Sequence, residues 1–173
     1  MALMASSRHE VGTQTYPPLV YVLVPLLALG LQSFLALHFP NFDLVDLPLL
    51  VTIYYAISRR EPISATLVGA LIGIAQDALT HHPLGIYGIA MAAIGYTAAS
   101  LGVRIDTENN GSRLLLTFGF TVEQMAVLWL LERHLLSQPF AWHGVQTLIS
   151  AAITAVVGVI VFALLDLTRR REG

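Results

Sequence analysis

The sequence predicts an all-α integral membrane protein with six transmembrane helices in a compact bundle. Of its 173 residues, 55% are hydrophobic and only 12% are charged, and the mean hydropathy is +0.70. Soluble domains instead carry about 25% charged residues. Apolar runs of roughly 20 residues, the length that crosses a bilayer, recur between short polar segments. The arginines gather on one side of these runs, as they do in cytoplasmic loops.

The apolar runs divide the chain into a leader, a membrane domain and a tail. The predicted spans, in chain order, are residues 18–39, 44–58, 63–80, 84–103, 114–136 and 145–168. We expect residues 1–16 to be a disordered cytoplasmic leader, residues 17–168 to be the membrane domain, and residues 169–173 to be a basic cytoplasmic tail. The first apolar run is too long for a signal-peptide core, so we expect a retained helix.

The positions of the basic residues predict the topology. All nine are arginines, and with six spans all of them except Arg133 fall on the side that holds both chain ends. The loop and tail arginines that would set this topology are Arg59, Arg60, Arg104, Arg113, Arg169, Arg170 and Arg171. Because cytoplasmic loops retain positive charge, both termini are predicted to be cytoplasmic. We expect the loop arginines Arg59, Arg60, Arg104 and Arg113 to set the topology or to contact anionic lipids, and contact with a cytoskeletal partner is the alternative.

The sequence lacks the residues that several classes of function require. There is no cysteine, which excludes disulfides and thiolate metal sites, and the net charge of −2 provides no footprint for nucleic acid. We find no nucleophile elbow, zinc-protease helix, Walker loop or dinucleotide fingerprint. His81 and His82 are the candidates for a metal site, but adjacent side chains diverge by about 100° on a helix and would need ligands elsewhere. A polar cap on a short outer loop is the alternative, and no cofactor is predicted.

Ionisable and amide side chains inside the predicted spans mark faces turned away from lipid. In span 114–136 the candidates are Glu123 and Gln124, which accompany Thr117 and Thr121 at helical spacing. Internal hydrogen bonding is one interpretation, and a polar pocket or partner surface is the other. Asp77 lies near the outer end of its span and Glu123 near the middle, so we do not expect a catalytic carboxylate pair.

Small residues form stripes along two of the predicted spans. In span 63–80 the stripe is Ala65, Gly69 and Gly73, and it ends at Asp77; in span 84–103 the members are Gly88, Ala92, Gly95, Ala99 and Gly102. Such stripes allow helices to approach closely. We expect them to pack inside the monomer, with a homodimer interface as the alternative. Asp77 and the loop to Gly85 are the candidate packing or partner surface.

Residues 40–104 contain a series of short motifs. In chain order they are Asp46-Leu47-Pro48, Tyr54-Tyr55, Arg59-Arg60, Gly69-x-x-x-Gly73-x-x-Gln76-Asp77, Leu84-Gly85 and Gly95-Tyr96. In these motifs the chain resembles the MreD family of bacterial rod shape-determining membrane proteins. The size and the six spans also agree with that family. His81-His82 departs from it, because small residues are expected there.

The resemblance implies a non-enzymatic scaffold of the cell-elongation complex in the bacterial inner membrane, which supports rod shape and lateral peptidoglycan synthesis. The implied partners are MreC, a class B penicillin-binding transpeptidase, RodA and MreB. The family is also similar in fold to the substrate-binding subunits of energy-coupling-factor transporters.

Two rival functions follow from the residues. The first is a transporter subunit that binds a vitamin-like ligand, with Tyr87, Trp129 and Trp142 toward the outer side as candidate pocket residues; an interfacial aromatic belt is the alternative role of these three. The second is an intramembrane lipid-modifying enzyme, for which Glu123 is the candidate catalytic group.

Overall fold

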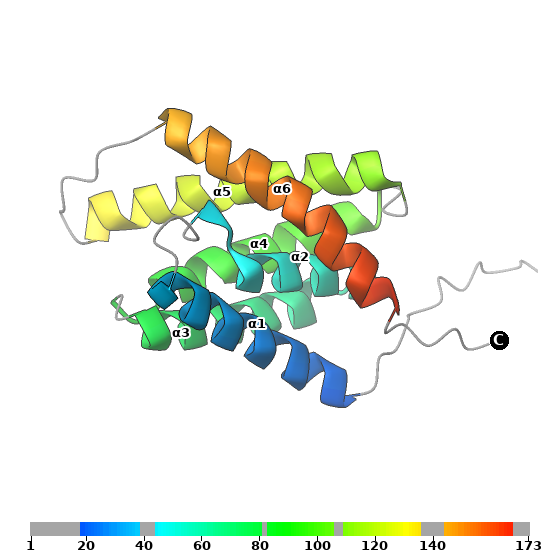
Figure 1. Ribbon diagram of the computed structural model, residues 1–173, viewed down its shortest axis with the longest axis horizontal. Coiled ribbons are helices and arrows are strands. Elements are labelled where there is room, and N and C mark those ends of the chain that lie inside the picture. Colours follow the sequence, from blue (N-terminus) through cyan, green and yellow to red (C-terminus); the bar gives the residue numbers. More distant parts are fainter. Residues whose placement is uncertain (1–17, 39–43, 81–82, 106–108, 136–143, 168–173) are drawn as a thin grey trace, which may run out of the picture.

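The computed structural model describes residues 18–38, 44–80, 83–105, 109–135 and 144–167. They form six helices and no strand: α1 (Pro18–His38), α2 (Leu47–Arg59), α3 (Pro62–Thr80), α4 (Ile86–Gly102), α5 (Asn110–Leu135) and α6 (Gly144–Leu167). Consecutive helices run in opposite directions (Figure 1). The end of the bundle at which α2, α4 and α6 begin is called the pocket end. The opposite end, at which α1, α3 and α5 begin, is called the arginine end. The predicted all-helical fold is confirmed.

Helix α2 lies at the centre of the bundle and contacts all five other helices. Residues 48–57 are buried without exception, because this helix is apolar around its whole circumference. Its 13 residues extend only about 20 Å at 1.5 Å per residue. That length is less than the roughly 30 Å hydrocarbon core of a bilayer.

The helix starts differ from the predicted ones for local reasons. The second helix begins at Leu47 instead of residue 44, because the Asp46 side chain caps it and Pro48 occupies its first turn. The fourth begins at Ile86 instead of residue 84, after Gly85, whose φ of 104° suits only glycine. The fifth begins earlier than predicted, at Asn110, because Asn109 Oδ1 accepts the Gly111 N–H at 2.9 Å.

Helices α3 and α4 approach so closely that their glycines lie against each other's backbone. A Cβ atom on Gly69 would collide with the carbonyl oxygen of Met91, and one on Gly73 would collide with that of Tyr87. From the other side, a Cβ on Gly95 would collide with the carbonyl oxygen of Ala65. The two small-residue stripes therefore face each other within one chain.

Within the described residues, three helices are long and apolar enough to cross a membrane: α3, α5 and α6. The described apolar parts of α1, α2 and α4 are shorter, so six crossings and the positions of the termini remain predictions. Large apolar side chains are exposed on the outer faces of α1, α3 and α6, among them Leu23, Leu27, Phe34, Ile63, Leu67, Leu71, Val145, Ile149 and Ile160. Side chains of this kind match a lipid environment.

We expect Gly95→Ala to destabilise the bundle, because the new methyl group would collide with the α3 backbone. Overpacking of this kind costs about 1–3 kcal/mol. The measurement is thermal unfolding of the purified protein in detergent. Gly119→Ala is the matched control, since a Cβ at Gly119 meets no atom within 4 Å among the described residues. An equal loss of stability in both variants would contradict the close packing of α3 on α4.

Candidate functional site

The carboxylate of Asp46 joins three helices at the pocket end. Its Oδ1 accepts the Leu49 N–H at 2.9 Å and so caps α2. Its Oδ2 accepts hydrogen bonds from Gln124 Nε2 of α5 at 2.8 Å and from Gln76 Nε2 of α3 at 3.4 Å. One acidic side chain therefore satisfies the start of the central helix and holds two other helices against it.

The local sequence explains how these groups reach Asp46. Thr117, Thr121 and Gln124 lie on one face of α5, and each is at most 1% exposed. Both threonine hydroxyls donate to the carbonyl oxygen one turn earlier, at 2.8 Å. Polar side chains in a helix that crosses hydrocarbon must be satisfied inside the protein. The buried amide of Gln124 is thus directed at the start of α2.

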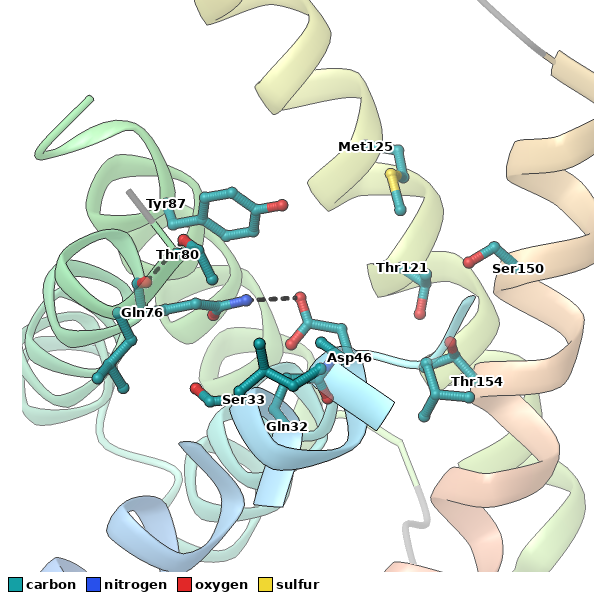
Figure 2. Close-up of a pocket in the computed structure, with 14 residues that line it drawn as sticks. Gln32, Ser33, Asp46, Gln76, Thr80, Tyr87, Thr121, Met125, Ser150 and Thr154 are labelled. Carbon is teal, nitrogen blue, oxygen red and sulfur yellow. Dashed lines mark hydrogen bonds between the residues drawn. The ribbon is translucent and has the colours of Figure 1, made fainter. Parts of the chain in front are cut away.

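A pocket of about 640 Å³ opens beside Asp46. Figure 2 shows α3 and α4 on one side of it, α5 and α6 on the other, and the start of α2 below. Its lining residues are Gln32, Ser33, Ala36, Leu37, Val45, Asp46, Gln76, Leu79, Thr80, Tyr87, Thr121, Met125, Ser150 and Thr154. Nine of these side chains are polar, which is costly in a membrane domain unless each finds a hydrogen-bond partner.

Asp77, near the end of α3, binds the backbone at the start of α4. Its carboxylate accepts backbone N–H groups from Gly85 at 2.8 Å, Tyr87 at 3.2 Å and Gly88 at 3.4 Å. The residue is fully buried. Because the first N–H groups of a helix have no partner within the helix, Asp77 takes the place of a cap for α4. The structure therefore places Asp77 and Gly85 in an internal contact.

Glu123 and Gln124 are neighbours on α5 but point at different helices. The Glu123 carboxylate lies 3.1 and 3.2 Å from Thr97 Oγ1 of α4, whereas Gln124 contacts Asp46. Both fall on the polar face that the sequence indicates. Of that pair, Gln124 is fully buried and Glu123 is half-buried.

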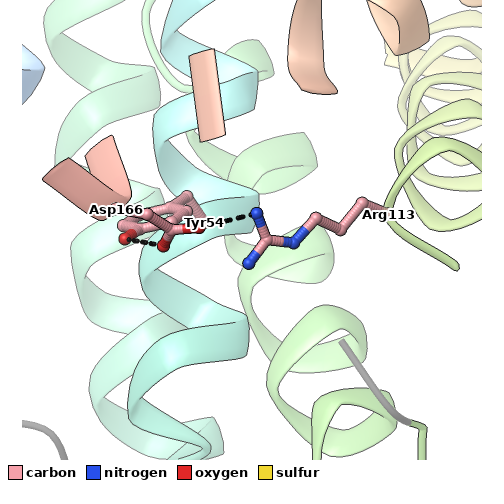
Figure 3. A network of polar contacts seen from close by, with 3 residues as sticks. All are labelled: Tyr54, Arg113 and Asp166. Atoms are coloured by element: carbon pink, nitrogen blue, oxygen red, sulfur yellow. Dashed lines mark hydrogen bonds and ion pairs between the residues drawn. The ribbon is translucent and has the colours of Figure 1, made fainter. Parts of the chain in front are cut away.

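The arginine end contains a second polar cluster, made by residues far apart in the chain. Arg113 Nη1 of α5 lies 2.7 Å from Asp166 Oδ2 of α6, and the Tyr54 hydroxyl of α2 donates to Asp166 Oδ1 at 2.8 Å (Figure 3). Arg113 was predicted as a topology residue and is also a structural contact. Arg104 is exposed at the same end.

The remaining predicted residues are distributed as follows. Gly88 and Ala99 are buried and Ala92 is half-buried on α4. Arg59 ends α2, and Arg60 is its C-cap with φ of 55°. Arg169, Arg170, Arg171, His81, His82 and Trp142 lie outside the described residues. No group of three potential metal-ligating side chains occurs in the part of the chain that the structure describes.

Of the aromatic residues predicted to line a pocket, Tyr87 does so, whereas Trp129 is not among its lining residues. Arg133 instead lies over the Trp129 ring, 5.1 Å from its centre. The roles of Asp46 and Asp166 were not predicted from the sequence. Asp46 before Leu47-Pro48 carries a helix-capping signal, but nothing local in the sequence indicates contacts with Gln76 and Gln124.

The model of a protein family, described as rod shape-determining protein MreD, matches residues 14–168. The chain belongs to the MreD family. The match extends over all six helices, so the membership applies to the whole bundle and confirms the resemblance found in residues 40–104. Comparisons with curated proteins and with solved structures gave no match. As a member of the MreD family, the chain is a membrane protein involved in determining rod shape.

We expect Asp77→Ala to destabilise the protein by about 1–3 kcal/mol, because it leaves buried backbone N–H groups without an acceptor. Asp77→Asn retains one acceptor oxygen and is expected to have a smaller effect. Thermal unfolding in detergent measures both variants. Full stability of Asp77→Ala would contradict the capping role.

The Arg113–Asp166 contact is expected to show energetic coupling. A double-mutant cycle with Arg113→Gln and Asp166→Asn should give a coupling energy of about 0.5–3 kcal/mol, as is usual for residues in direct contact. The coupling energy is calculated from the unfolding free energies of the unaltered protein, the two single variants and the double variant. Strict additivity would show that the ion pair does not stabilise the fold.

Proposed function

We propose that the protein is a non-enzymatic scaffold of the bacterial cell-elongation complex. In this proposal it lies in the cytoplasmic membrane and contacts MreC, together with the class B transpeptidase, RodA and MreB. It thereby supports lateral peptidoglycan synthesis. The observation that carries the proposal is the match of residues 14–168 to the rod shape-determining family.

The arrangement of the helices supports a role exerted by contact. Nearly all of the described residues belong to six helices joined by short connections. Apolar side chains cover the outer faces of α1, α3 and α6, so these faces suit lipid or a partner's transmembrane helix. The polar side chains Asp46, Asp77 and Asp166 are used in internal contacts.

The proposal includes an orientation in the membrane. The arginine end, with Arg59, Arg60, Arg104 and Arg113, faces the cytoplasm, and the pocket end faces outward. Its support is the bias of arginines in the sequence, because positively charged loops stay in the cytoplasm. The stripe glycines Gly69, Gly73 and Gly95 then act by holding α3 and α4 in one fixed arrangement that partners recognise.

Copurification tests the scaffold role directly. The tagged full chain is expressed at its native level, solubilised in a mild detergent, and its partners are identified by mass spectrometry. We expect MreC and the wall-synthesis enzymes to be recovered. Their absence from the sample would contradict the scaffold proposal.

A variant pair connects the fold to the function. We expect Gly73→Leu to reduce MreC recovery and rod shape, because the new side chain would enter the α4 backbone at Tyr87. Gly119→Leu is the control, since the space around Gly119 is open among the described residues. The measurements are MreC recovery per molecule of solubilised protein and cell aspect ratio. Normal values for Gly73→Leu would contradict a role for the α3–α4 arrangement.

The pocket supports one alternative function, that of a substrate-binding membrane subunit of a vitamin-type transporter. Its volume of about 640 Å³ lies within the range of small-molecule sites. The same copurification separates the two functions, because a transporter subunit would bring down an ATPase pair and a transmembrane coupling subunit.

A further inference from the structure

Six hydroxyl side chains line the pocket. Four of them donate their hydrogens inside the protein. Each donates to a backbone carbonyl oxygen at 2.7–3.0 Å: Thr80 to Gln76, Thr121 to Thr117, and both Ser150 and Thr154 to Leu44. A hydroxyl has one hydrogen to donate and lone pairs that accept. These four groups therefore offer acceptors to anything that enters the pocket.

Gln76 offers an acceptor as well. The NH₂ end of the Gln76 amide faces Asp46 and donates to its Oδ2, as Figure 2 shows. Its Oε1 has no hydrogen-bond partner among the described residues, although Gln76 is only 6% exposed. A buried acceptor without a partner costs about 1–3 kcal/mol. We therefore expect Gln76 Oε1 to accept a hydrogen bond from a donor that enters the pocket.

The charge of the residues that line the pocket favours a ligand that donates hydrogen bonds. Asp46 is the acidic residue of the lining, and no arginine or histidine is among the described residues that form it.

We propose that this pocket binds a ligand through a primary ammonium group. An ammonium group has three N–H donors and no acceptor, which complements the Asp46 carboxylate, Gln76 Oε1 and the hydroxyl oxygens. Leu37, Leu79 and Met125 form an apolar part of the wall for the rest of the molecule. The inference goes beyond the scaffold role and does not depend on it.

Two sources carry the same ammonium chemistry: a soluble amine and the headgroup of an aminophospholipid. For the soluble source, the purified full chain in detergent is titrated with ethanolamine, and unfolding is followed by tryptophan fluorescence. We expect the Tm to rise by about 3 °C or more at saturation. Choline, which has the charge but no N–H donor, and ethylene glycol, which has only hydroxyls, are expected to give no rise.

For the lipid source, the protein is placed in nanodiscs of phosphatidylethanolamine, phosphatidylcholine or phosphatidylglycerol. A headgroup ligand raises the Tm only with phosphatidylethanolamine, and native mass spectrometry then shows that lipid retained. A rise in either the soluble or the lipid experiment supports the proposal and identifies the source. No rise in both, or an equal rise with choline or phosphatidylcholine, overturns it.

Variants connect the effect to the pocket. Asp46→Asn keeps an oxygen to cap α2 but removes the charge, so the apparent affinity for the amine is expected to fall about tenfold or more. Met125→Trp fills the pocket and is expected to abolish the Tm rise even if Asp46→Asn does not fold. Glu123→Gln is the control, because Glu123 faces Thr97 instead of the pocket. An unchanged rise in Met125→Trp overturns the proposal.

Discussion

The burial of α2 on all sides is the constraint on which the rest of the structure depends. The first backbone N–H groups of this 13-residue helix at the centre of the bundle have no partner within the helix. Asp46 resolves this by accepting the Leu49 N–H with one oxygen and the amides of Gln76 and Gln124 with the other. The position of α2 and the positions of α3 and α5 are thus fixed by one carboxylate.

At two other helix ends a buried or partly buried carboxylate likewise contacts more than one helix. Asp77 accepts the backbone N–H groups at the start of α4, and Asp166 joins Arg113 of α5 to Tyr54 of α2. Between these points, glycine allows α3 and α4 to touch through their backbones. A bundle held in this way has a fixed outer surface, which suits a member of a shape-determining family whose proposed role is contact with partners.

The pocket lies where the bundle is least tightly joined. Its wall includes residues of α1, α3 and α4 on one side and of α5 and α6 on the other. Among the described residues, the helices of the two sides contact each other only through α4 and α5. A molecule bound there would touch both sides at once.

The sequence by itself determined the helical class, the order of the six apolar helices, the close-packing stripes and the family. The helical class, the helix order and the stripes depend on composition and on local periodicity, which are complete within each segment. The family was identified from residue motifs in residues 40–104. Tertiary structure decided what the polar side chains do. Asp46 lies 30 residues from Gln76 and 78 from Gln124, and Asp166 lies 53 from Arg113. A carboxylate at a helix end looks the same in sequence whether it faces water or a buried amide. Only the packing of distant helices distinguishes them, because it decides which side chains lose their contact with solvent.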